Sequence, residues 1–180
     1  WSGDVPFTHT DSDSLQLVTK YKYDDQGRQI RKEDPEGMVT CTAYGDNETR
    51  IYRGWDSSTH TAALPIQVNK INDDDLTTDL YTVDPTGVTE GYNGTTNLPT
   101  GVDSGESQAD YLTWTHYGYN TTTALLETED RYHNIPSSGS GDLGDDYHRT
   151  FYGYDAIGRR THVIQVVSGT DATGLTGCVE

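Results

Sequence analysis

The sequence predicts an all-β protein, and three observations lead to that fold class. Apolar or aromatic residues alternate with polar ones at period 2, most clearly from Leu15 to Tyr23 and from Tyr111 to Tyr119. Tyrosine outnumbers phenylalanine 13 to 2, which favours half-exposed strands over a thick apolar core. Helix signals are almost absent, because the one candidate, Ala124 to Asp130, is short and bounded by threonine.

Each strand is predicted from its alternation and from the turn signals beside it. Tight turns are indicated where glycine closes a short polar run, because glycine supplies the positive φ that hairpins demand. These runs are Asp25-Gln26-Gly27, Pro35-Glu36-Gly37, Pro85-Thr86-Gly87 and Ala156-Ile157-Gly158. The predicted strands are 15–23, 38–44, 50–55, 64–71, 111–119, 149–154 and 160–167.

Length and composition predict one β-repeat domain over 15–180, within a chain of 180 residues. Two stretches rich in Gly, Ser and Asp, near 96–108 and 137–146, are expected to be loop insertions. Residues 1–14 are expected to form an extended segment that pairs with a neighbour. Because the chain begins at Trp1, we expect a processed product or an internal piece of a longer protein.

The charge balance argues against two classes of partner. The chain has 29 acidic and 12 basic residues, for a formal net charge of −17. Nucleic-acid binding depends on Lys and Arg that neutralise phosphates, so no nucleic-acid partner is expected. Anionic lipid headgroups would repel the chain, and no apolar run approaches the length of a membrane helix, so no membrane insertion is expected.

An internal repeat is the strongest feature of the sequence. Residues 21–28 and 152–159 share the skeleton Tyr-x-Tyr-Asp-x-x-Gly-Arg without gaps. Shorter copies begin at Tyr117 and Tyr44, the first with Asn120 in place of the aspartate. Each copy predicts a strand, a turn opened by an Asp side-chain hydrogen bond, and a return strand. The residues that define the repeat are Tyr21, Tyr23, Asp24, Gly27, Arg28, Tyr117, Tyr119, Tyr152, Tyr154, Asp155, Gly158 and Arg159.

This skeleton resembles the YD (Tyr-Asp) repeat of the RHS and teneurin family of large secreted or cell-surface proteins. Residues 23–40 match that repeat closely, including its Asp-Pro-x-Gly turn, and Asp84 to Thr89 repeats the latter half. The resemblance implies antiparallel hairpins stacked into a coiled β-sheet ribbon or solenoid. In bacterial members such a ribbon forms a shell around a C-terminal toxin, and in animals it carries an adhesion receptor. Four to six repeats are too few to close a shell, and residues 168–180 do not suggest a toxin domain, so we expect a segment of repeat architecture without its cargo.

From this resemblance we predict a non-enzymatic, extracellular structural protein that assembles head-to-tail or belongs to a larger shell or filament. Its expected partners are further copies of the chain or other parts of a longer YD-repeat chain. A fragment of a toxin-encasing shell is a variant of the same prediction. The alternative is a carbohydrate-binding or adhesion module that stacks Trp55 and Trp114 on sugar rings, although these aromatics are more simply explained as the packing of the repeat itself.

Other candidate sites carry weaker signals. No nucleophile, acid/base pair or phosphate-binding loop is recognisable, so neither an enzyme nor a cofactor is predicted. Three consecutive acids, Asp73, Asp74 and Asp75, are the weak candidates for Ca²⁺. Cys41 and Cys178 could form an intrachain disulfide or pair with another chain. Glycosylation sequons stand at Asn47, Asn93 and Asn120.

Overall fold

The structure is a computed structural model that describes residues 17–86, 88–104 and 106–168. Within these residues the chain is all β and its named strands pair antiparallel, as predicted. The described residues contain no α-helix, and one 3₁₀ turn spans Gln108–Asp110. The all-β fold class and the antiparallel pairing are therefore confirmed, while the coiled ribbon or solenoid stays a prediction.

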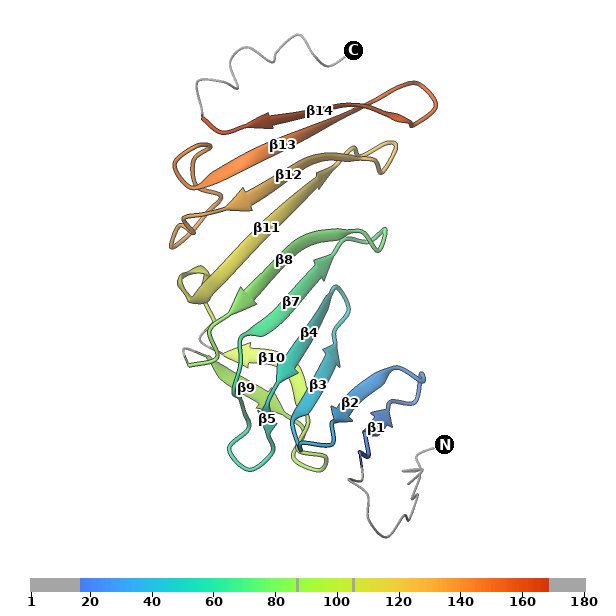
Figure 1. Ribbon diagram of the computed structural model, residues 1–180, viewed down its shortest axis with the longest axis vertical. Coiled ribbons are helices and arrows are strands. Elements are labelled where there is room, and N and C mark those ends of the chain that lie inside the picture. The colour runs from blue at the N-terminus through green and yellow to red at the C-terminus, as the bar shows by residue number, and fades with distance from the viewer. Residues whose placement is uncertain (1–16, 87, 105, 169–180) are drawn as a thin grey trace. The chain divides into compact units, whose positions relative to one another are not determined.

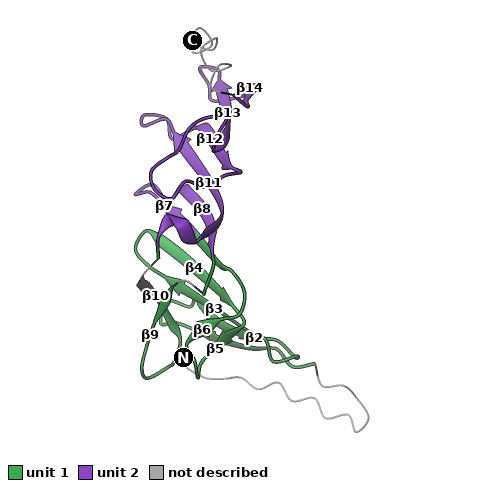
Figure 2. Cartoon of the chain, turned by 90° about the vertical axis from the view of Figure 1, so that its left-hand side faces the viewer, with its two compact units in different colours: residues 1–68, 84–106 green, residues 69–83, 107–180 purple. Residues whose placement is uncertain are grey.

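The chain divides into two compact units where the sequence suggested one repeat domain (Figure 2). The first unit comprises 1–68 and 84–106, and the second comprises 69–83 and 107–180, each within its described residues. Strand β7 (Ile66–Ile71) begins in the first unit and ends in the second.

The first unit is built on four strands that follow one another in chain order. Alternation sets which side is buried: in β3 the side chains of Cys41 and Ala43 are buried, while those of Thr40 and Thr42 are less so. The β9–β10 hairpin packs against β3 and β4, and the short β5–β6 hairpin contacts β3 through β5. The strands are β1 (Lys20–Tyr23), β2 (Gln29–Glu33), β3 (Val39–Tyr44), β4 (Glu48–Arg53), β5 (Trp55–Asp56), β6 (Thr61–Ala62), β9 (Thr89–Tyr92) and β10 (Pro99–Ser104).

The second unit is an antiparallel sheet in which each strand lies beside the next one along the chain (Figure 1). In the described part of this unit, β8 and β11 are the one pair of neighbouring strands with other strands between them in the sequence, namely the β9–β10 hairpin of the first unit. The strands are the end of β7, then β8 (Thr77–Val83), β11 (Tyr111–Tyr119), β12 (Leu126–Tyr132), β13 (Tyr147–Tyr154) and β14 (Arg160–Val166).

Most predicted strands are found, and the differences have physical reasons. The predicted strand 50–55 is divided into β4 and β5 by Gly54, whose φ of 67° breaks the extended conformation. The predicted loop near 96–108 contains β10, and β8, β9 and β12 were not anticipated. The helix candidate 124–130 lies largely in β12, because tertiary pairing overrides a weak local preference. Residues 137–146 connect β12 to β13 without a strand, as expected of an insertion.

Candidate functional site

The first full copy of the repeat folds into a tight turn held by its aspartate. One carboxylate oxygen of Asp24 accepts hydrogen bonds from the backbone N–H groups of Gln26 and Arg28, at 3.0 and 2.8 Å. The other oxygen accepts from Arg28 Nε at 2.7 Å. Gly27 has a φ of 79°, which a residue with a side chain rarely adopts. We call this arrangement the Asp–Arg turn.

The second full copy repeats the Asp–Arg turn bond for bond. Asp155 accepts from the backbone N–H groups of Ile157 and Arg159 at 3.1 and 2.9 Å, and from Arg159 Nε at 2.7 Å. Gly158 has a φ of 80°. The backbone N–H of Arg159, followed by its side chain, lowers the pKa of the Asp155 carboxyl below its ordinary value. The shared letters of the sequence therefore specify one shared structure.

We predict that Asp24→Ala and Asp155→Ala lower the melting temperature by similar amounts. Each substitution removes three hydrogen bonds that fix a turn of the same geometry. Differential scanning calorimetry measures both, with Asp25→Ala as the control at the neighbouring exposed position. A response at only one aspartate would show that the two turns are not equivalent units.

The shortened copy at Tyr117 keeps the first part of this turn and replaces the rest. Asn120 Oδ1 accepts from the backbone N–H groups of Thr122 and Thr123, at 2.9 Å each. Ala124 takes the positive φ, at 56°, that glycine supplies in the full copies. The turns at Asp34, Asn72, Asp84 and Asn93 also begin with a side-chain oxygen that accepts a backbone N–H two residues on.

A second repeated feature joins one hairpin to the next. The hydroxyl of Tyr119, the last residue of β11, donates to the carbonyl of Thr77, the first residue of β8, at 2.8 Å. The hydroxyl of Tyr154, the last residue of β13, donates to the carbonyl of Leu126, the first residue of β12, at 2.9 Å. In both cases the tyrosine bonds the strand beside it on the side of the preceding hairpin. We call this contact the inter-hairpin tyrosine bond.

The first unit contains the same bond. The hydroxyl of Tyr44, which ends β3, donates to the carbonyl of Gln29, which begins β2, at 3.1 Å. The guanidinium of Arg28 also lies over the Tyr44 ring, 4.3 Å from its centre. The turn arginine of one hairpin therefore covers the tyrosine of the next.

We predict that Tyr119→Phe and Tyr154→Phe each reduce the free energy of unfolding by about 1 kcal/mol, because each removes one hydrogen bond and leaves a carbonyl unpaired. Tyr23→Phe is the matched control: Tyr23 holds the same place in the motif but forms no inter-hairpin tyrosine bond within the described residues. Urea denaturation measures all three. An equal loss at Tyr23 would show that the hydroxyl bond is not what is being measured.

In the second unit, a row of aromatic rings in contact with one another lies toward the strand ends opposite the inter-hairpin tyrosine bonds. This row, which we call the aromatic ladder, stabilises those strand ends. Tyr81 stacks on Tyr111 with ring centres 4.1 Å apart, and Trp114 stacks on Tyr132 at 3.9 Å. Tyr132 then meets Tyr147 at 5.1 Å. Trp114 therefore packs inside the repeat. The sequence analysis attributed Trp114 to the packing of the repeat, and the structure identifies Tyr132 as the ring on which it stacks.

Trp55, the other predicted sugar-stacking residue, is also engaged within the protein. Its side chain is 4% exposed, its ring meets that of Tyr52 edge-on, and its Nε1 donates to the carbonyl of Asn97 at 2.9 Å. The indole is therefore held mainly by contacts within the first unit.

Charged residues of alternating sign stand opposite one another across four strands of the second unit. Asp79 faces His116, His116 faces Asp130, and Asp130 faces Arg149. His116 Nδ1 lies 2.8 Å from Asp79 Oδ1, and this hydrogen bond raises the pKa of the imidazole. Arg149 binds Asp130 with two contacts of 2.6 Å. Asp79, His116, Asp130 and Arg149 therefore form one row of facing residues across the sheet.

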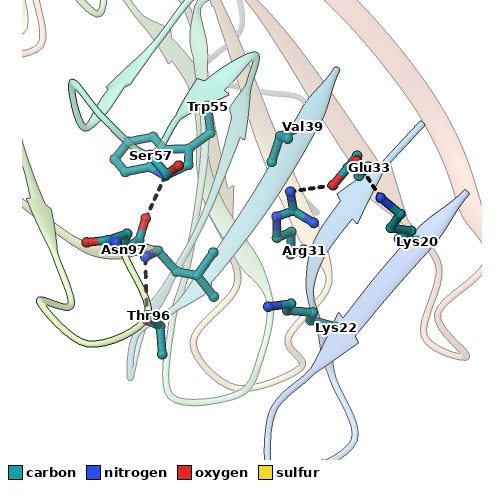
Figure 3. Close-up of a pocket in the computed structure, with 10 residues that line it drawn as sticks. Lys20, Lys22, Arg31, Glu33, Val39, Trp55, Ser57, Thr96 and Asn97 are labelled. Atoms are coloured by element: carbon teal, nitrogen blue, oxygen red, sulfur yellow. Dashed lines mark hydrogen bonds and ion pairs between the residues drawn. The ribbon is translucent and has the colours of Figure 1, made fainter. Parts of the chain in front are cut away.

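The first unit contains a pocket of about 360 Å³ whose wall includes three cations (Figure 3). Lys20 and Arg31 share one carboxylate, that of Glu33, at 3.0 and 2.6 Å. Lys22 has no ion pair within the described part of the chain. This local excess of positive charge is unusual in a chain with a net charge of −17. The lining residues are Lys20, Lys22, Arg31, Glu33, Val39, Trp55, Ser57, Thr96, Asn97 and Leu98.

The remaining predicted site residues lie apart from one another. Cys41 is fully buried in β3 with a free thiol, and burial raises its pKa to about 11. Cys178 lies outside the described residues, so the disulfide stays a prediction. Asp73, Asp74 and Asp75 occupy the β7–β8 turn, and the described residues contain no group of three side chains that could hold a metal ion.

The three sequon asparagines all lie between strands. Asn47 and Asn93 are exposed, while the Nδ2 of Asn120 donates to Glu127 at 2.8 Å. A glycan on Asn120 would compete with that bond. Glycosylation at all three positions stays a prediction.

Comparison with known proteins adds no relative: no protein-family model matches the chain, and no curated protein is similar to it. Among the described residues, no helix is long and apolar enough to cross a membrane.

Proposed function

We propose that this chain is a non-enzymatic structural segment of an extracellular YD-type β-ribbon, of the kind that coils into a shell or filament. One observation carries the proposal: the inter-hairpin tyrosine bond recurs at Tyr44, Tyr119 and Tyr154 with the same placement on the preceding hairpin. A contact that repeats from hairpin to hairpin is what lets a repeat architecture grow by adding units.

The outermost hairpins support growth beyond this segment. Within the described residues, β1 is hydrogen-bonded only to β2, and β14 only to β13. The Arg159 side chain is 75% exposed, whereas that of Arg28, which covers Tyr44, is 42% exposed. Tyr23 is likewise 55% exposed. The two outer hairpins therefore present the same residues that inner hairpins use against each other, and a further hairpin would cover them.

The proposal is tested on the natural protein. An antibody against this segment is used on cell-surface, secreted and intracellular fractions of the organism that makes it. We expect a surface or secreted species far larger than 19.9 kDa, the mass of this chain. A 19.9 kDa species confined to the intracellular fraction would overturn the proposal.

A second candidate function is the binding of an acidic carbohydrate, favoured by the pocket in the first unit. Three cations converge there with the side chains of Ser57, Thr96 and Asn97, a combination of charge and hydrogen-bonding groups suited to a sugar carboxylate and its hydroxyls (Figure 3). A pocket of about 360 Å³ accommodates one or two sugar rings.

Glycan binding is tested with an array that contains neutral, carboxylated and sulfated oligosaccharides. We expect acidic glycans alone to bind, and Lys22→Ala to weaken them more than Lys32→Ala, an exposed lysine of β2 that does not line the pocket. Silence across the array, with the chain folded, removes this candidate and leaves the structural role.

A further inference from the structure

The three inter-hairpin contacts share one register. Cys41, His116 and Phe151 each stand three residues before the bonding tyrosine, and they face Arg31, Asp79 and Thr128. Each of these facing residues stands two positions after the residue whose carbonyl the tyrosine bonds. Fixing the tyrosine bond therefore fixes which side chains stand opposite each other.

One of the three pairs has a basic residue three positions before the bonding tyrosine, and it shows which facing residue compensates that charge. At the β8–β11 contact His116 faces Asp79 at 2.8 Å, so a carboxylate supplies the counter-charge. In the first hairpin the residue three positions before Tyr23 is Lys20, with Lys22 on the same side of the strand. The Lys20 side chain remains 62% exposed although it pairs with Glu33. β1 therefore presents positive charge where β11 presents His116.

Strand β14, the last strand among the described residues, does not supply the matching negative charge. In the shared register the Tyr23 hydroxyl of a second copy would bond the carbonyl of Arg160, because Arg160 begins β14 as Thr77 begins β8. Lys20 would then face His162, and Lys22 would lie nearest Arg160. Basic residues directly opposite each other on neighbouring strands are unfavourable.

We propose that β1 is a docking edge for a β-strand that carries a carboxylate two residues after the carbonyl bonded by Tyr23, and that it rejects β14 of a second copy. This inference rests on the proposed ribbon function and names the partner of its first edge. Main-chain pairing supplies affinity at such an edge, and the side chains opposite Lys20 and Lys22 supply selectivity. β1 therefore pairs with a strand of different sequence, and β14 of one copy does not dock on β1 of another.

The test gives β14 the carboxylate that the proposal requires of a strand pairing with β1. β8 begins Thr77-Thr78-Asp79 and β14 begins Arg160-Thr161-His162, so R160T/H162D gives β14 the start of β8. Sedimentation velocity at low salt is expected to show head-to-tail association at least 10-fold tighter than that of the unaltered chain. The gain should shrink at high salt, because exposed ion pairs are screened.

Two controls separate charge from shape. R160T/H162N has nearly the same shape without the carboxylate. Because it removes the basic residues opposite Lys20 and Lys22, it should associate more tightly than the unaltered chain but less tightly than R160T/H162D. Adding Lys20→Asp to R160T/H162D should abolish the gain, since two carboxylates would then face each other. Circular dichroism and melting temperature establish that each variant is folded.

The outcomes distinguish this inference from the function on which it rests. If R160T/H162D associates no more tightly than R160T/H162N, the charge selectivity of β1 is wrong. If the unaltered chain already associates head-to-tail and Tyr23→Phe weakens it, the selectivity is wrong but growth of a ribbon through β1 stands. The ribbon function itself is tested separately, by the size and location of the natural protein. It would be overturned by a 19.9 kDa species confined to the intracellular fraction.

Discussion

Removing the carboxylate of Asp130 is expected to destabilise the second unit by about 3 kcal/mol. Asp130 is 3% exposed and receives two 2.6 Å contacts from Arg149, whose side chain is 30% exposed. Asp130→Ala therefore leaves a partly buried guanidinium without its counter-ion and also opens space in the sheet. Urea denaturation monitored by tryptophan fluorescence measures the change.

A double variant shows whether the stability lost in Asp130→Ala comes from an uncompensated charge or from disturbed packing at this position. Asp130→Leu combined with Arg149→Met replaces both charges with apolar groups, and it should recover most of the stability lost in Asp130→Ala, because no charge is left uncompensated. Arg131→Ala is the matched control, since its side chain is 75% exposed and its partner Glu129 keeps the hydrogen bond from the Tyr152 hydroxyl at 2.6 Å. We expect that control to cost less than about 1 kcal/mol. A double variant as unstable as Asp130→Ala would contradict an electrostatic origin.

The turns could be predicted from sequence because all their interactions are local. Asp24, Gly27 and Arg28 lie within five consecutive residues, and their types alone specify the side-chain acceptor, the positive φ and the cation that closes the turn. The copy at 155–159 has the same geometry because it has the same letters. Strand β11 was predicted with its observed bounds for a similar reason, since its alternation is continuous.

The sites that depend on register could not be predicted. Asp79, His116 and Arg149 form one row only after three strand pairings are known. Their residue types carry no local signal. β12 was missed because Glu129 and Asp130, consecutive acids that are 7% and 3% exposed, violate the alternation expected of a strand. Their burial makes sense only with the partner arginines and Tyr152 in place.

The pocket of the first unit was missed for the same reason. Its cations come from β1 and β2, whereas Trp55 and Asn97 come from segments far along the chain. The one available signal was the charge distribution, because five of the 12 basic residues fall between positions 20 and 32.

A buried cluster in the first unit makes its stability depend on pH. Arg50 is 6% exposed, contacts Glu48, and lies 2.5 Å from Glu106. Glu90, also 6% exposed, adds a third carboxyl beside this one guanidinium. Burial raises the pKa of Glu90 to about 7 despite the attraction of Arg50, and the charge of Glu106 adds to the rise. Near neutral pH the folded chain therefore holds a proton that the unfolded chain has already released.

Glu90→Gln is expected to raise the free energy of unfolding by about 3 kcal/mol above pH 8, which is the free-energy equivalent of a pKa near 7 against an ordinary value of 4.5. A raised carboxyl pKa favours the folded state when protonated, so the unaltered chain loses stability as pH rises from 4.5 to 7, while the variant does not. Below pH 4.5 both states of the unaltered chain are protonated and the two proteins should be equally stable. Urea denaturation at pH 4, 6 and 8.5 measures this, with Glu36→Gln in the exposed β2–β3 turn as control. A stabilisation that is the same at all three pH values would show that the amide packs better than the carboxyl, and that ionisation of Glu90 is not the cause.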